Sequence, residues 1–160
     1  MPEVDQEIAL LEQEEAKKWN ERRKKLPILA LDFDGVIHSY VSGWKGATEI
    51  PDPPVEGAAL AIACLFDAYR IVIFSARADE IANPGGRHAI AAWLAMCGIP
   101  FDDITAIKPP AFLLVDDRAI CFAGHWADTM KSIREFRHYF QGEHGCGAPA
   151  VAAPNSEPQR

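Results

Sequence analysis

The sequence lacks long apolar segments. None of its hydrophobic runs approaches the roughly 20 residues that a membrane-spanning helix needs. The first residues include Glu3, Asp5 and Glu7, where a secretory signal would carry an apolar stretch. The four cysteines lie far apart and form no CxxC pair, which argues against a zinc or disulfide framework. These absences predict a cytoplasmic protein with no membrane partner.

An excess of positive charge is also missing. The chain has 23 acidic and 16 basic residues and a net charge of -7, which argues against a broad nucleic-acid surface. This charge still allows a small pocket for one phosphate. The length of 160 residues and the 49% of hydrophobic residues are those of one globular domain with a real core. Cys64, Cys97 and Cys121 lie in apolar stretches and are expected to be reduced thiols in that core.

Composition divides the chain into three parts. Residues 1–25 carry acids first and then lysines and arginines, an order that suits a helix dipole. We expect a charged helical extension that is solvated or loosely docked, with partner binding or self-association as the alternative. Residues 26–141 are expected to form the folded domain. Residues 142–160 are rich in Gly, Ala and Pro, which predicts a disordered tail.

Within the middle part, apolar runs alternate with helical patterns. Strands are expected at 28–33, 70–74, 103–107 and 112–115, with a further short strand at 119–122, and helices at 55–67, 86–97 and 127–140. The last helix has Met130, Ile133, Phe136 and Phe140 at helical spacing, so these side chains are expected to face the core. The alternation predicts an α/β fold with a parallel sheet and helices on both faces. In such folds, ligands bind beyond the carboxyl ends of the strands.

Acidic pairs follow two of the predicted strands. The run 28–31 leads into Asp32 and Asp34, and the run 112–115 leads into Asp116 and Asp117. Because burying a carboxylate is costly, acids at a strand end usually lie where the chain leaves the core. An extended chain would place Asp32 and Asp34 on the same side. Converging carboxylates predict a site for a hard cation such as Mg²⁺, which prefers oxygen ligands.

Three further residues suit phosphoryl chemistry. Ser75 ends the strand at 70–74, where a hydroxyl and free amides would suit a phosphoryl oxygen. Lys108 precedes Pro109 and Pro110, and its charge would offset that of a phosphoryl group in transfer. Arg77 has two interpretations, a contact with substrate phosphate or a surface salt bridge. With two carboxylates, one can attack phosphorus while the other handles protons.

These residues resemble the four motifs of the haloacid dehalogenase (HAD) superfamily of phosphohydrolases. The resemblance covers residues 28–122 and implies a three-layer, Rossmann-like parallel sheet. It implies that Asp32 is a nucleophile that becomes an aspartyl-phosphate, and that Asp34 is the general acid/base. Ser75 and Lys108 would hold the phosphoryl group. The Mg²⁺ would be bound by residues of the two acidic pairs: Asp32, Asp34 through its carbonyl, Asp116, and Asp117, which would bind through water or orient Lys108.

Two short insertions bear on the substrate. The segments 38–55 and 79–106 are too short for a full cap domain, which predicts a minimal cap and an open site. Residues 39–54, called the flap below, carry Tyr40, Trp44 and Lys45. These three residues either touch a leaving group or pack the flap for its own stability.

The function expected from these observations is a Mg²⁺-dependent phosphomonoesterase acting on a phosphorylated small molecule or nucleotide. The segments Phe74-Ser75-Ala76-Arg77 and Val115-Asp116-Asp117-Arg118 also resemble the phosphatase domain of polynucleotide kinase-phosphatases. A nucleic-acid 3′-end phosphatase is therefore one alternative. A non-catalytic scaffold with the same fold is another, because a catalytic core does not need the charged N-terminal helix.

Overall fold

The computed structural model describes residues 2–136, which fall into two units that divide between Asp117 and Arg118. The first unit contains every residue of the predicted site. The tail predicted at 142–160 lies outside the described residues, as do Phe140 and Cys146.

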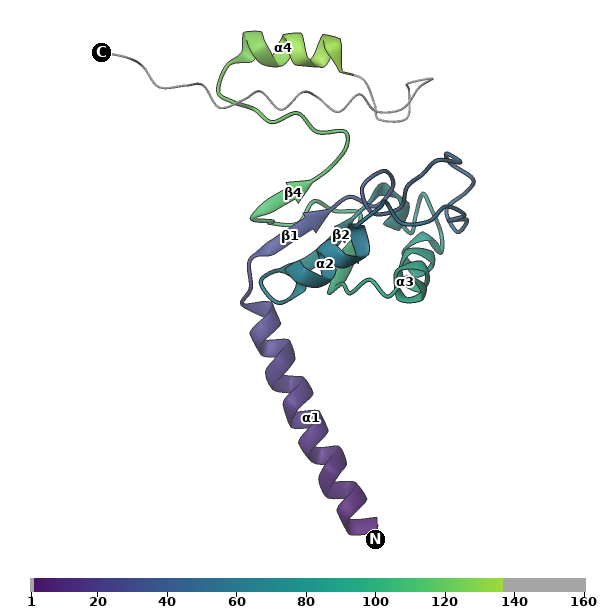
Figure 1. The fold of residues 1–160 in the computed structure, drawn as a ribbon, viewed down its shortest axis with the longest axis vertical. Helices are drawn as coiled ribbons and strands as arrows, with labels where there is room; N and C mark the ends of the chain where they lie inside the picture. Colours follow the sequence, from purple (N-terminus) through teal and green to yellow (C-terminus); the bar gives the residue numbers. More distant parts are fainter. Residues whose placement is uncertain (1, 137–160) are drawn as a thin grey trace, which may run out of the picture. The chain divides into compact units, whose positions relative to one another are not determined.

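A parallel sheet forms the centre of the first unit. Its strands are β1 (Ile28–Leu31), β2 (Arg70–Phe74), β3 (Asp103–Thr105) and β4 (Leu113–Val115), in the order β3-β2-β1-β4. All three pairings are parallel, so the predicted α/β class with a parallel sheet is confirmed. The chain runs outward from β1 through β2 to β3 and then returns to the other side of β1 (Figure 1). The boundary between β1 and β4 is thus a topological switch point, where open α/β sheets bind ligands.

A glycine precedes each of the two helices that connect these strands, and another follows the second helix. α2 (Ala58–Phe66) links β1 to β2, and α3 (Gly86–Met96) links β2 to β3. α2 starts later than predicted because Gly57 before it has a φ of 81°, which no helix accommodates. At the end of α3, Gly98 has a φ of 67° directly after the capping residue Cys97, a left-handed conformation that terminates the helix.

The core lies on one face of the sheet. The strand register places Leu29, Leu31, Ile71, Ile73 and Ile104 on the same face, and all five are buried. Both helices add to this cluster, α2 through one side chain and α3 through three (Ile62; Ile90, Trp93 and Leu94). On the opposite face, the connection from β3 to β4 lines a cavity of about 330 Å³ together with side chains of the strands.

The predicted N-terminal helix is α1 (Pro2–Lys24). Its described side chains from Ala9 to Arg22 are exposed, but Arg23 is buried and joins the domain. The Arg23 guanidinium forms an ion pair with Asp102, donates to the carbonyls of Phe66 and Tyr69, and stacks 3.6 Å from the centre of the Phe66 ring. The last turn of α1 is therefore part of the folded unit and not a loose extension.

The second unit contains α4 (Trp126–Glu135). Residues 119–122 do not form the predicted strand, although the Phe122 ring packs against Trp126 at 5.2 Å. The prediction that Met130 and Ile133 face a core is wrong for this structure, in which both are exposed. Phe136, also predicted to face the core, is 37% exposed.

The cysteine prediction also needs correction. Of the three cysteines among residues 2–136, Cys64 and Cys121 are exposed, and Cys97 is partly buried, which raises the pKa of its thiol. The apolar character of the neighbouring residues was misleading, because Cys64 lies on the outer side of α2. No helix within residues 2–136 combines the length and apolar character needed to cross a lipid bilayer.

Candidate functional site

Three carboxylates meet at the carboxyl ends of β1 and β4. Oxygens of Asp32, Asp116 and Asp117 all lie within 4.8 Å of one another. The backbone holds them there, because the Asp32 amide donates to the Val115 carbonyl over 2.9 Å and continues the β1–β4 pairing past the end of both strands. Both oxygens of the Asp117 carboxylate are shielded from solvent. The sequence therefore identified three residues that the fold brings together at the switch point.

The Asp32 carboxyl is the most perturbed acid of this cluster. Burial raises its pKa, the negative charges of Asp116, Asp117 and Asp34 raise it further, and a hydrogen bond from the Phe33 amide offsets part of the effect. The resulting pKa is about 7. Several partly buried carboxylates that repel one another form an arrangement that a cation would stabilise.

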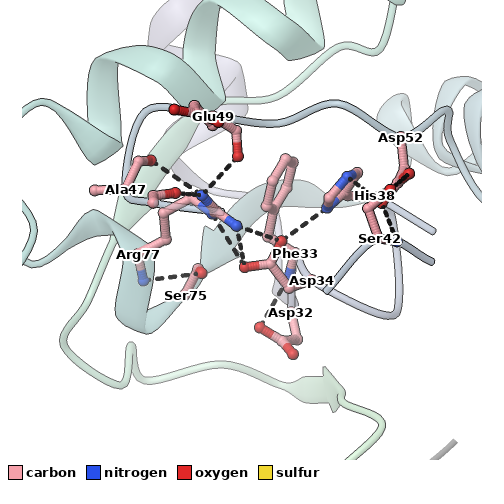
Figure 2. A network of polar contacts seen from close by, with 11 residues as sticks. Asp32, Phe33, Asp34, His38, Ser42, Ala47, Glu49, Asp52, Ser75 and Arg77 are labelled. Atoms are coloured by element: carbon pink, nitrogen blue, oxygen red, sulfur yellow. Dashed lines mark hydrogen bonds and ion pairs between the residues drawn. The ribbon is translucent and has the colours of Figure 1, made fainter. Parts of the chain in front are cut away.

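Asp34 belongs to a different network from Asp32. The chain does not stay extended after Asp32, because the Phe33 carbonyl accepts hydrogen bonds from the amides of Ile37 and His38 and closes a turn. Figure 2 shows the Asp34 carboxylate pointing toward Arg77 and His38, and the Asp32 carboxylate pointing away from them. The expectation that an extended chain places Asp32 and Asp34 on the same side is therefore wrong.

Two basic side chains hold the Asp34 carboxylate. Arg77 donates to it through Nε and Nη2 at 3.0 Å, and Nδ1 of His38 lies 2.8 Å away. Burial by itself would raise the pKa of Asp34, but the hydrogen bonds from His38 and Arg77 and the charge of Arg77 outweigh it and lower the pKa below its usual range. Asp34 is thus held as a carboxylate, a form that accepts protons rather than donating them.

Arg77 ties the flap to this network. It follows Ser75 in a short 3₁₀ turn, and only 2% of its surface is exposed. Its Nη1 donates to the carbonyls of Gly46, Ala47 and Glu49, the shortest of these bonds being 2.6 Å to Gly46. Figure 2 shows the bonds to Ala47 and Glu49. Arg77 therefore forms a buried ion pair rather than the surface salt bridge of the second interpretation, and each of its three guanidinium nitrogens has a partner in the protein.

His38 and Asp52 also belong to the network, and sequence reasoning missed this role for both. His38 is fully buried, with its Nε2 3.6 Å from Asp52 and its ring stacked 5.5 Å from that of Phe33. Asp52 in turn accepts hydrogen bonds from the amide and hydroxyl of Ser42 at 2.8 and 2.7 Å. The only sequence signal was a histidine four residues after Asp34, a spacing that a tight turn brings into contact.

Ser75 lies at the carboxyl end of β2, as predicted, and is buried. Its hydroxyl oxygen accepts a hydrogen bond from the Arg77 amide over 3.2 Å and caps the 3₁₀ turn. Ser75 therefore positions Arg77, and its hydroxyl hydrogen remains available for a second contact.

Lys108 has a different setting from the one expected. Its side chain is exposed and lines the cavity on the sheet face opposite the core, together with Arg70, Thr105 and the two following prolines. The charges that shift the pKa of Asp32 are those of Asp34, Asp116 and Asp117, and Lys108 is not among them. The structure thus unites three of the predicted residues, places Asp34, Ser75 and Arg77 in an adjoining network, and puts Lys108 on the sheet face.

The carboxylate cluster fits a hard divalent cation. Three anionic oxygens within 4.8 Å of one another provide the ligand type that Mg²⁺ prefers, and Mg²⁺ usually keeps several waters beside one or two carboxylates. The mutual repulsion that raises the pKa of Asp32 would be relieved by two positive charges.

Comparison with protein-family models, with curated proteins and with solved structures finds no match to this chain.

Proposed function

We propose that this protein is a Mg²⁺-dependent phosphomonoesterase that works through an aspartyl-phosphate on Asp32. The observation that carries the proposal is the position of Asp32, directly after β1, at a topological switch point and within 4.8 Å of Asp116 and Asp117. Such an arrangement gives one carboxylate access to a ligand beyond the strands while its neighbours hold a cation. We further propose a HAD-like, Rossmann-type fold with a third layer on the second sheet face and the flap as a minimal cap.

Asp32 supplies the nucleophile in this proposal. Its carboxylate oxygen forms a bond to phosphorus as the bond to the leaving oxygen breaks, which leaves a phosphoryl group on Asp32. Water then attacks phosphorus and releases inorganic phosphate. A cation bound by Asp32, Asp116 and Asp117 would lower the repulsion between the carboxylate and the anionic phosphate.

The contacts of Asp34 with Arg77 and His38 favour the base part of its expected acid/base role. Because Arg77 and His38 hold Asp34 as a carboxylate, it is in the form that accepts a proton from the attacking water, as a weaker base than a free carboxylate. Donation of a proton to the leaving group would require a proton that this environment disfavours. We therefore assign Asp34 to the hydrolysis of the phosphoenzyme, and the leaving oxygen of the first step takes its proton from solvent water.

The substrates proposed are phosphorylated small molecules or nucleotides, in a cytoplasmic setting.

Lys108 retains the proposed role of a phosphate-binding residue only if its segment moves toward Asp32 when substrate binds. The Lys108→Ala variant separates these possibilities, because a large rise in KM requires a contact with substrate.

The test is a hydrolysis screen with Mg²⁺ over sugar phosphates, nucleotides and 3′-phosphorylated oligonucleotides. Asp32→Asn should abolish turnover on every substrate that the wild type hydrolyses. Asp34→Asn should slow hydrolysis of the intermediate, so that acid-quenched protein carries more bound phosphate than the wild type. Glu56→Gln, a change at an exposed acid outside the cluster, is the matched control. Full activity in Asp32→Asn would refute the proposal, and a preference for oligonucleotides would identify the 3′-end alternative.

A further inference from the structure

An aromatic ring of the flap lies on the buried arginine of the site. The centre of the Trp44 ring is 4.4 Å from the Arg77 guanidinium carbon, so that the cation covers one face of the ring. Trp44 nevertheless remains 49% exposed, whereas Arg77 is 2% exposed. A large aromatic side chain is thus packed on one face against a cation and open on the other, where a second planar group can stack.

The flap holds this ring in a fixed place. Arg77 binds the carbonyls of Gly46, Ala47 and Glu49, which directly follow Trp44 and Lys45 in the chain. The Ser42 amide and hydroxyl are bound to Asp52 on the preceding side. Trp44 therefore lies between two anchored points, and a ligand that stacks on it would pay little to order it.

The same guanidinium connects Trp44 to the acidic residues. Its Nε and Nη2 bind Asp34 at 3.0 Å, and the charge of Asp34 acts in turn on Asp32. One side chain thus separates the indole from the Asp34 carboxylate. A leaving group on a phosphate at Asp32 would have to extend past Arg77 to meet the indole.

We propose that the open face of Trp44 is a stacking subsite for a planar aromatic ring in the leaving group of the phosphate ester. This inference rests on the proposed function and narrows its substrate class to nucleotides and aryl phosphates. Stacking of a base on an aromatic side chain tolerates any base, because every base has a π face. Arg77 strengthens the platform from below, since it holds the indole in one orientation and leaves only the outer face for the ligand.

The test compares two substrates that differ only in the aromatic ring. Adenosine 5′-monophosphate and ribose 5-phosphate share the sugar and the reacting ester, so that intrinsic reactivity cancels. Trp44→Ala should reduce kcat/KM for the nucleotide about tenfold more than for ribose 5-phosphate, with most of the change in KM. Trp44→Phe should retain part of the preference. Phenyl phosphate shows whether any aromatic ring suffices or whether a nucleobase is required.

Trp126→Ala provides the matched control, because Trp126 is 70% exposed and belongs to α4 in the second unit. It should leave the ratio of the two kcat/KM values unchanged. If Trp44→Ala reduces both substrates equally, Trp44 only packs the flap and the subsite is refuted while the phosphatase proposal stands. If the wild type hydrolyses neither substrate, binding of the same two compounds by calorimetry with Mg²⁺ decides: an adenosine preference lost in Trp44→Ala supports the subsite, and no preference overturns it.

Discussion

Arg77 and Asp34 form a buried ion pair in which two guanidinium nitrogens contact the carboxylate, each at 3.0 Å. The pair joins three segments that are distant in the sequence: the end of β2, the turn after β1, and the flap. Because the third guanidinium nitrogen binds flap carbonyls, the position of Asp34 and the position of the flap depend on the same side chain. This linkage makes Arg77 the residue whose replacement should disturb the site most without touching the acidic cluster.

Arg77→Ala should destabilise the protein by about 3–5 kcal/mol, because it leaves a partly buried carboxylate and the flap carbonyls without their donor. Arg77→Lys keeps the charge but loses the planar fork, so it should recover only part of this loss. Urea unfolding followed by far-UV circular dichroism measures both. The control is Arg87→Ala, which removes an exposed ion pair with Asp103 and should cost less than about 1 kcal/mol. Equal losses in Arg77→Ala and Arg87→Ala would contradict the central position of Arg77.

Gly86 should not tolerate a side chain. A Cβ atom at this position would lie 2.0 Å from the Arg77 carbonyl oxygen, a separation that neither backbone can accept without moving. Gly86→Ala is therefore expected to displace the start of α3 or the Arg77 turn and to lower the melting temperature strongly. Gly43→Ala is the comparison, because Gly43 has a φ of 69° but open space around it, and only the backbone conformation should cost about 1 kcal/mol there. A melting temperature for Gly86→Ala at or above that of Gly43→Ala would show that the two segments separate easily.

The end of α1 should contribute to the stability of the domain. Arg23 pairs with Asp102, and the same carboxylate accepts a 2.7 Å hydrogen bond from the Ile71 amide near the start of β2. Arg23→Ala should therefore lower the free energy of unfolding by about 3–5 kcal/mol. Glu21→Gln, which removes an exposed pair with Lys24 one turn away, should leave the free energy of unfolding almost unchanged. If the two variants have nearly the same free energy of unfolding, α1 is a loose extension that does not stabilise the domain.

The parts of the site that local sequence could predict are those that depend on strand ends. Runs of apolar residues located β1 and β4, and the acids that follow them met because parallel strands present their carboxyl ends at one edge. The β1 prediction failed at its last two residues, because the backbone leaves the strand in a turn in which the Phe33 carbonyl accepts from the amides of Ile37 and His38, and the apolar run does not encode that turn. That turn is also what separates Asp34 from Asp32.

The sequence did not reveal the directions in which the side chains of Arg77, Lys108 and Cys64 point. Arg77 follows a strand end like the acids do, yet its guanidinium turns into the protein because three flap carbonyls and Asp34 attract it there. These partners lie 28 to 43 residues away in the chain. For Lys108, the two prolines predicted a restricted backbone but not the face of the sheet on which the segment runs. The exposure of Cys64 likewise depends on which side of α2 meets the sheet.

The pKa of Asp32 predicts how stability depends on pH in the absence of metal. A carboxyl with a pKa near 7 in the folded state and near 4 in the unfolded chain binds a proton more tightly when folded. Its stabilising contribution is complete below about pH 4 and is lost as the pH rises through about 7. The free energy of unfolding should therefore fall across this window by up to about 1.4 kcal/mol per pH unit relative to Asp32→Asn, which cannot ionise.

The Asp34 carboxyl changes the stability with pH in the opposite direction, and it does so in a more acidic range. Its pKa is lowered in the folded state, so its contribution is present above about pH 4 and is lost only as the pH falls further. Subtracting the Asp32→Asn curve from the wild-type curve removes this and all other shared titrations. Chemical denaturation from pH 4.5 to 8 in the presence of a chelator provides both curves. If the difference between the wild-type and Asp32→Asn curves does not change with pH, the neighbouring acids do not raise the pKa of Asp32.

Mg²⁺ should reverse this loss of stability. At pH 8 the ionised Asp32 repels Asp116 and Asp117, and a cation held among the three should raise the melting temperature with increasing concentration, because it binds the folded state only. At pH 5 the proton on Asp32 competes with the cation, so the shift should be smaller. Asp116→Asn should weaken the response at both pH values, whereas Asp128→Asn, an exposed acid of α4, should leave it unchanged. A thermal shift that is independent of pH or equal in Asp116→Asn would place the cation away from these carboxylates.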